Sequence, residues 1–136
     1  NIDVTSIPMA GEAGGLAGGL ATIGANLQSG FEAVSERVDL VNLIEDADLV
    51  ITGEGKVDDS SFDGKVVGGV LALADQMKTP AIVIAGSIDP NLTIEVPAYS
   101  LKEDVGEEKA FSDTKRSITK TSRKAFDNWS VNPPKG

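Results

Sequence analysis

The chain has 136 residues and a formal net charge of −9, which allows one domain with a real core but not two full lobes. It contains no Cys and no His, so disulfides, thiolate metal sites and the commonest general base are excluded, and catalysis must rest on carboxylates, Lys or Arg, hydroxyls, backbone amides or a bound metal. Residues 1–100 hold 15 acidic and 4 basic residues, which argues against nucleic-acid and membrane partners, and we expect a cytoplasmic protein.

The N-terminal part is predicted to form glycine-rich helices. Within residues 9–28 the apolar side chains recur at helical spacings of three and four: Leu16, Leu20, Ile23 and Leu27. Each glycine inside such a helix costs about 1 kcal/mol relative to Ala, so close packing on a sheet or a ligand at the helix start must compensate. Gly30 ends this element, and residues 31–44 are predicted as one or two short amphipathic helices.

A strand, a helix and a second strand follow, and together they predict the fold class. Residues 48–52 and 81–85 are short, apolar and rich in β-branched side chains, whereas residues 66–77 carry apolar positions at helical spacing. Apolar strands joined by a helix are typical of a right-handed parallel βαβ unit. We therefore expect an α/β fold, a parallel-sheet Rossmann-like three-layer α/β/α unit, with an irregular third strand at residues 94–99.

The C-terminal part is predicted to be one helix. Ser100 and Glu103 have the spacing of a capping box, so the helix is expected to begin there. Its apolar face continues at near-helical spacing and is predicted to be core or an intersubunit surface: Val105, Phe111, Ile118, Ala125 and Trp129. Residues 105–136 thus form a helical tail, and residues 132–136 are expected to fray at its end.

The turn after the first predicted strand carries the most chemistry. The sequence Gly53-Glu54-Gly55-Lys56-Val57-Asp58-Asp59 follows that strand at its carboxyl end, where open α/β sheets bind their ligands, and Gly64-Lys65 comes shortly after. The two glycines of the turn let backbone N–H groups approach an anion. The spacing of these residues matches neither the P-loop nor the dinucleotide-binding fingerprint.

The side chains of this turn suit a phosphate with its magnesium. The carboxylates of Glu54, Asp58 and Asp59 can hold Mg²⁺ or accept a proton from an attacking hydroxyl. Lys56 or Lys65 can neutralise phosphate or carboxylate charge. The alternative interpretation is a solvated acidic turn without a function.

A second candidate anion site is the glycine run from Gly11 to Gly19. Free backbone N–H groups at a helix start can hold an anion. Tight packing of a helix on a sheet explains the same glycines equally well, and the carboxylate of Glu12 would repel an anion.

In combination these motifs resemble the C-terminal part of the bacterial glycerate kinase family of the type-one class. The family carries a Gly/Ala-rich segment like residues 10–16 and a stretch of the form Asp-Leu-Val-Ile-Thr-Gly-Glu-Gly-basic-aliphatic-Asp, which matches residues 48–58. A Gly-Lys pair, a Gly-Val turn into a helix and an Ala-Gly-Ser after a strand also match, at residues 64–65, 69–70 and 85–87. The resemblance extends from Pro8 to Leu101.

The resemblance implies ATP-dependent phosphorylation of glycerate, at the 2-hydroxyl rather than the 3-hydroxyl, by a two-lobed α/β enzyme that binds ATP, Mg²⁺ and glycerate between its lobes. Of the matched positions, Asp58 becomes the candidate base or magnesium carboxylate, and Glu54 the second metal-side carboxylate. Lys65 becomes the cation for phosphate or substrate. The other expected substrate- or phosphate-binding positions are Gly11, Gly14, Gly15, Gly53, Gly55, Lys56 and Gly64.

The chain begins at Asn1 rather than Met, and members of this family are considerably longer. We therefore expect a fragment that lacks the N-terminal part of the same chain and is inactive alone. Two other hypotheses stay open at this point: a non-catalytic α/β module that binds a small anion, and a truncated gene product.

Overall fold

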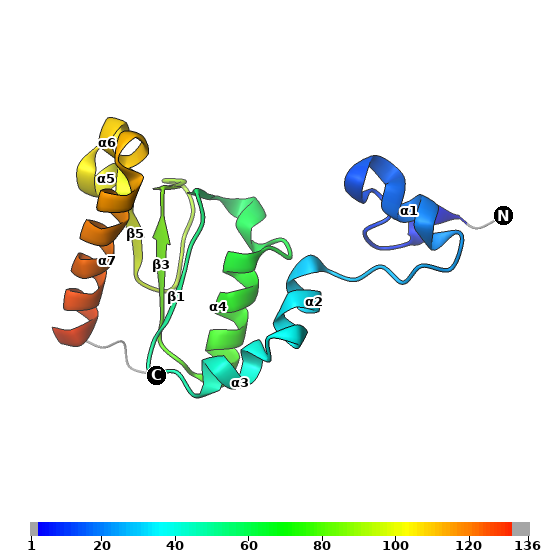
Figure 1. Cartoon of the computed structure of the whole chain (residues 1–136), viewed down its shortest axis with the longest axis horizontal. Coiled ribbons are helices and arrows are strands. Elements are labelled where there is room, and N and C mark those ends of the chain that lie inside the picture. Colours follow the sequence, from blue (N-terminus) through cyan, green and yellow to red (C-terminus); the bar gives the residue numbers. More distant parts are fainter. Residues whose placement is uncertain (1–2, 132–136) are drawn as a thin grey trace. The chain divides into compact units, whose positions relative to one another are not determined.

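The computed structural model describes residues 3–131, and the chain divides into two compact units, Asn1–Val38 and Asp39–Gly136 (Figure 1). Within the described residues, no helix combines the length and the apolar character that crossing a lipid bilayer requires. The expected fraying of residues 132–136 lies outside the described residues.

The first unit consists of short helical segments: η1 (Val4–Ser6), η2 (Glu12–Gly15), α1 (Leu16–Ala21) and α2 (Gly30–Arg37). The expectation of a longer helix in residues 9–28 is wrong, because α1 has only six residues. Ala13, Gly14 and Gly15 have φ angles of 52°, 67° and 92°, which a right-handed helix cannot contain. The helix therefore begins only after the third of these residues.

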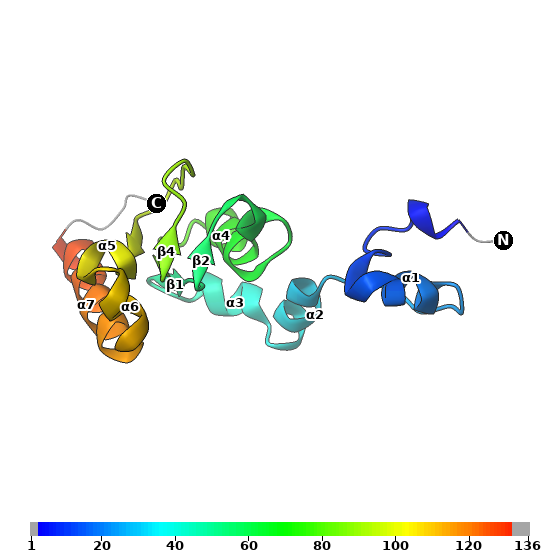
Figure 2. The same cartoon turned by 90° about the horizontal axis from the view of Figure 1, so that it is seen from above.

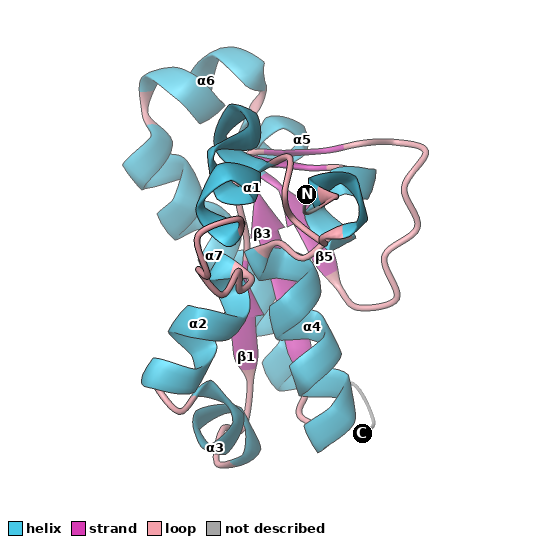
Figure 3. Ribbon diagram, turned by 90° about the vertical axis from the view of Figure 1, so that its right-hand side faces the viewer, coloured by secondary structure: helices cyan, strands magenta, loops and turns pink. Residues whose placement is uncertain are grey.

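The second unit is built on a parallel sheet of three strands, β1 (Val50–Thr52), β3 (Ala81–Ala85) and β5 (Ala98–Ser100), in the order β1-β3-β5 (Figure 3). The strands predicted at residues 48–52 and 81–85 and their parallel pairing are confirmed. The third strand exists but is shorter than predicted. Because all three strands run the same way, their carboxyl ends lie at one edge of the sheet.

Helices cover both faces of this sheet, which confirms the three-layer α/β/α architecture. On one face α4 (Val66–Met77) contacts β1 and β3, and α3 (Leu40–Glu45) packs beside α4. On the other face α7 (Thr114–Val131) contacts β3 and β5. The strands lie between α4 and α7 in both views (Figure 1; Figure 2).

The core of the second unit consists of small, mostly β-branched side chains. Val57, Val67, Val83 and Ala85 are buried and pack together. The buried hydroxyl of Thr79 donates a hydrogen bond of 2.9 Å to the carbonyl oxygen of Ile44 and so links the loop before β3 to α3. These contacts hold α4 and β3 in place and thereby fix the strand ends that follow.

The C-terminal part forms three helices, α5 (Leu101–Val105), α6 (Glu107–Ser112) and α7, so the expectation of one continuous helix is wrong. Gly106, at φ +84°, ends α5, and Asp113, at φ −134°, ends α6. Neither conformation is helical. The predicted cap at the start is present, because Ser100 Oγ accepts a hydrogen bond of 3.4 Å from the N–H of Glu103.

The breaks between these helices change which apolar side chains are covered. Phe111, expected on the apolar face, is 74% exposed, whereas Ala125 is fully buried. Trp129 is partly buried, and its ring centroid lies 5.5 Å from that of Phe126. Only part of the expected apolar face therefore belongs to the core.

Replacing Ile82 by Ala tests the position of β3 in the core. Ile82 is 1% exposed, so the truncation leaves a cavity, and we expect the free energy of unfolding to fall by about 2–5 kcal/mol. The same replacement at Ile23, which is 81% exposed, should change it by less than about 0.5 kcal/mol. Urea unfolding followed by circular dichroism measures both, and equal losses would contradict the central position of β3.

Candidate functional site

The candidate site lies where β1 and β3 end. The turn of residues 53–55 follows β1 and leads into β2 (Lys56–Val57), and Gly86 follows β3 and leads into β4 (Ser87–Ile88). β2 and β4 pair in parallel, so the two segments that follow β1 and β3 stay side by side beyond the main sheet. The N–H of Gly86 donates to Glu54 O at 3.1 Å, and the N–H of Ser87 donates to Gly55 O at 3.0 Å. The two turns thus form one hydrogen-bonded platform.

The glycines in and near this platform are explained by different physical constraints. A Cβ at residue 53 would collide with the backbone of Ile84, and a Cβ at residue 86 would collide with the carbonyl oxygen of Gly55, so both positions require glycine for packing. Gly64, at φ +71°, requires glycine for its left-handed backbone. Gly55 has neither reason: its φ is not positive, and a Cβ there would meet no atom within 4 Å. The missing side chain at residue 55 leaves open space above the platform.

Three of the predicted side chains lie together, and Ser60 joins one of them to the others. We call Lys56, Asp58, Ser60 and Lys65 the lysine–aspartate cluster. Lys56 Nζ lies 3.0 Å from Asp58 Oδ2. Asp58 Oδ1 accepts a hydrogen bond of 2.7 Å from Ser60 Oγ, and Ser60 Oγ in turn accepts one of 2.7 Å from Lys65 Nζ. The structure therefore brings Lys56, Asp58 and Lys65 together.

Local structure explains the geometry of the cluster. Asp58 is the N-cap of the 3₁₀ helix η3 (Asp59–Phe62), and its backbone N–H donates to Ser61 Oγ at 3.0 Å in a reciprocal capping box. Lys65 has an extended backbone directly before α4. The short helix η3 thus turns the chain back and places Lys65 beside the residue that opens it.

The cluster shifts two pKa values in opposite directions. The hydrogen bond from the Ser60 hydroxyl, followed by that from Lys56, holds the pKa of the Asp58 carboxyl below its ordinary value of 3.8. The hydrogen bond to Asp58 and the attraction of its charge raise the pKa of the Lys56 ammonium above its ordinary value of 10.5. At neutral pH both groups are therefore charged.

Glu54 lies apart from the lysine–aspartate cluster. It lines a cavity of about 420 Å³ at the ends of β1 and β3, and its Oε1 is buried without a hydrogen-bond partner. Most of the other lining groups are glycine or apolar: Gly53, Gly55, Gly86, Ile51, Ile84, Leu101 and Ile118. An unpartnered buried carboxylate oxygen is costly, so this atom suits a hydroxyl donor or a cation of a ligand.

Of the two carboxylates predicted to bind magnesium, Glu54 fits this role better than Asp58. Mg²⁺ commonly takes one or two protein carboxylates and completes its shell with water and substrate phosphate. One oxygen of Glu54 has no hydrogen-bond partner, whereas the oxygens of Asp58 already contact Lys56 and Ser60. Among residues 3–131 no group of three or more acidic side chains gathers to hold a metal ion.

The remaining predicted positions are three glycines of the first unit and Asp59 of η3. Gly11, Gly14 and Gly15 belong to the first unit, where Gly14 and Gly15 need glycine for positive φ and Gly11 faces open space. Asp59 is exposed within η3. Sequence reasoning missed Ser60, whose signal is the Asp-x-Ser spacing of a capping turn. It also missed Thr114 and Ser122 of α7, which line the cavity but lie too far along the chain for any local signal.

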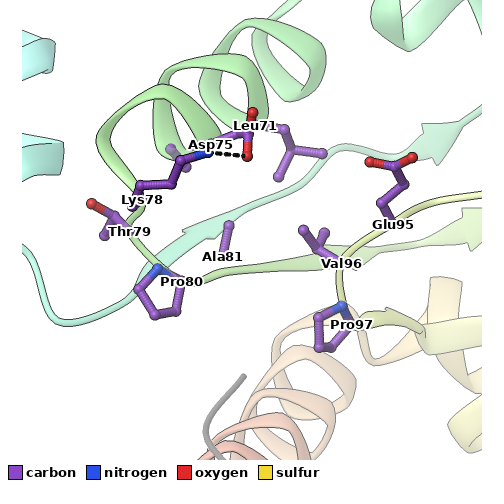
Figure 4. Close-up of a pocket in the computed structure, with 10 residues that line it drawn as sticks. Leu71, Asp75, Lys78, Thr79, Pro80, Ala81, Glu95, Val96 and Pro97 are labelled. Atoms are coloured by element: carbon purple, nitrogen blue, oxygen red, sulfur yellow. Dashed lines mark hydrogen bonds and ion pairs between the residues drawn. The ribbon is translucent and has the colours of Figure 1, made fainter. Parts of the chain in front are cut away.

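A second cavity lies at the opposite ends of the strands and is unrelated to this platform. It has a volume of about 270 Å³ and is lined by the end of α4, by Ala81 of β3 and by the residues before β3 and β5, among them Pro80 and Pro97 (Figure 4). Its one ion pair joins Lys78 Nζ to Asp75 Oδ1 at 3.2 Å and is exposed. No residue predicted for the site lines it.

Comparison with known proteins points to one family. The family model described as the glycerate kinase family matches residues 1–130. Glycerate 2-kinase of Escherichia coli is 43% identical over 95 residues, which are 69% of this chain and 25% of that protein. A glycerate kinase of Bacillus cereus is 38% identical over 118 residues, covering 86% of this chain and 29% of that protein.

A solved structure agrees with these relatives. A crystal structure assigned as a glycerate kinase 2 from Salmonella typhimurium matches 85% of this chain at 31% identity with a TM-score of 0.50. The match covers 33% of that protein. The chain likewise spans only 24% and 22% of other matched relatives, so it matches only part of each of these proteins.

Replacing each of the two glycines of the turn by Ala tests which of them is tightly packed and which faces open space. Gly53→Ala should lower the free energy of unfolding by about 3 kcal/mol or more, because the new methyl group collides with the backbone of β3. Gly55→Ala should change it by less than about 0.5 kcal/mol. Thermal unfolding of the two variants beside wild type measures the difference, and a stable Gly53→Ala variant would contradict the close approach of the strands.

The pH dependence of Asp58 follows from its lowered pKa. A carboxyl with a lowered folded-state pKa stabilises the fold above its unfolded pKa and loses this contribution as pH falls through the folded value. The stability advantage of wild type over Asp58→Asn should therefore be constant near neutral pH and shrink below pH 3.8. Carboxyl ¹³C NMR should give an Asp58 midpoint below 3.8 in wild type and a higher one in Ser60→Ala. Identical midpoints would contradict the role of the hydroxyl.

Proposed function

The chain belongs to the glycerate kinase family, and from this premise we propose that the longer protein of which it is a part phosphorylates glycerate with ATP at the 2-hydroxyl. Relatives named glycerate kinase and glycerate 2-kinase support the reaction. The observation that carries the assignment to this segment is the lysine–aspartate cluster, which lies beside a turn with open space at the carboxyl end of a parallel sheet.

In this proposal the cations of the cluster bind the anionic groups of the substrates. Both phosphoryl transfer and glycerate binding place negative charge near the reacting atoms, and catalysis rests mainly on positioning and on neutralising that charge. Lys65 Nζ contacts a neutral hydroxyl and keeps its full charge for a ligand. Lys56 is paired with Asp58, so it contributes less net charge at the same place.

The carboxylates have different roles in this proposal. The lowered pKa of Asp58 makes it a weak proton acceptor, so its role is a permanently charged group that orients the lysines or a substrate hydroxyl. Glu54 would hold Mg²⁺ through its unpartnered oxygen, and the ion, when bound with ATP, supplies charge neutralisation at the phosphates. Gly55 leaves room for a ligand to approach the backbone of the turn.

The isolated chain is proposed to be inactive. It spans about a quarter of its relatives, and the second unit supplies one face of a site that needs two substrates and a metal in register. The proposal also places the full protein in the cytoplasm, where ATP is available.

The test uses the full-length protein with glycerate, ATP and Mg²⁺. Lys65→Met and Asp58→Asn should each lower kcat/KM by about 100-fold or more, because each removes a charge from the cluster. The matched controls are Lys78→Met and Asp75→Asn, which break an exposed ion pair at the other end of the strands and should leave the rate unchanged. NMR of the product identifies which hydroxyl carries the phosphate.

Two results would contradict the proposal in different ways. Absence of glycerate phosphorylation by wild type would reject the activity. Full turnover by both cluster variants would reject the site while leaving the family intact.

A further inference from the structure

Ser60 stands between a carboxylate and an ammonium that would otherwise be free to pair. Its hydroxyl has one proton and can also accept hydrogen bonds. Both of its side-chain contacts are 2.7 Å long, one to Asp58 Oδ1 and one to Lys65 Nζ. An ammonium cannot accept a hydrogen bond, so the hydroxyl must accept from Lys65 and donate its proton to Asp58. The chemistry of the three groups thus fixes the direction of both hydrogen bonds.

This arrangement treats the two lysines of the cluster differently. Lys56 forms an ion pair with Asp58, whereas none of the ion pairs found in residues 3–131 includes Lys65. An ammonium has three N–H donors, and the contact with Ser60 uses one of them. Two donors and a charge without an ion-pair partner remain, directly before the first turn of α4, where backbone N–H groups also favour an anion.

We propose that Ser60 is a positioning residue, which holds the Lys65 ammonium beside Asp58 without an ion pair and so presents it to an anionic group of a substrate. The inference rests on the proposed function and deepens it. The anionic group is a phosphate of the nucleotide or the carboxylate of glycerate, and the two sources share the chemistry that Lys65 recognises. Without the hydroxyl, Lys65 turns to Asp58 or into solvent, and the substrate must reorder it on binding.

The experiment measures KM for glycerate, KM for ATP and kcat separately in the full-length protein. Ser60→Ala should raise one of the two KM values about tenfold, which corresponds to the loss of one hydrogen bond to a charged group, with a smaller change in kcat. Ser60→Thr keeps the hydroxyl and should restore that KM. Ser112→Ala, on the exposed end of α6, is the matched control and should equal wild type.

A second variant separates positioning from a general loss of the turn. Ser61→Ala removes the other half of the capping box without touching Lys65. If Ser61→Ala raises the same KM as Ser60→Ala, the effect belongs to the turn and the proposal is overturned. It is also overturned if Ser60→Ala matches the control or if Ser60→Thr fails to restore binding.

A binding measurement tests the role of Ser60 independently of whether the protein phosphorylates glycerate. Calorimetric titration of the full-length protein with glycerate and, separately, with ADP reports binding even if wild type does not phosphorylate glycerate. In that case the proposed function fails, and weaker binding of either compound by Ser60→Ala than by Ser112→Ala still supports the positioning role. Equal binding by the two variants, or no binding by wild type, rejects it.

Discussion

The candidate site depends on the parallel pairing of β1 with β3. Because Thr52 lies opposite Val83 in parallel strands, the segments that follow β1 and β3 leave the sheet at the same edge. Their turns then hydrogen-bond to each other through the carbonyl oxygens of Glu54 and Gly55. Backbones can approach this closely only because residues 53 and 86 lack side chains. A side chain at either position would push the two turns apart and displace the side chains of the candidate site.

The platform separates two electrostatic environments within a few residues of chain. The lysine–aspartate cluster is largely exposed to water, so its charges persist and its hydrogen bonds are exchangeable. Glu54 lines a mostly apolar cavity, and its Oε1 is buried, so water cannot fully solvate that oxygen. An anionic substrate group suits the first environment, and a hydroxyl or a cation suits the second. This division gives the proposed roles of Lys65 and Glu54 a common physical basis.

Elements with a strong local pattern were predictable, and those decided by single backbone conformations were not. Residues 66–77 and 81–85 have clear periodicity and are bounded by Gly-Lys and Thr-Pro, so both ranges agree with the structure. The long helices expected in residues 9–28 and after Ser100 are broken instead. Periodicity reports which side chains share a face, but it does not report that Ala13 or Gly106 has a positive φ.

The amino-acid sequence by itself determined the parallel α/β class, the family and the placement of acids, lysines and glycines directly after a buried strand. Tertiary structure alone decided that one oxygen of Glu54 is buried without a partner, and that Gly55 faces open space whereas Gly53 does not. The physical reason is that a residue's type and neighbours in sequence set its local preferences. Its burial and hydrogen-bond partners depend instead on segments that meet only when the sheet and its helices assemble.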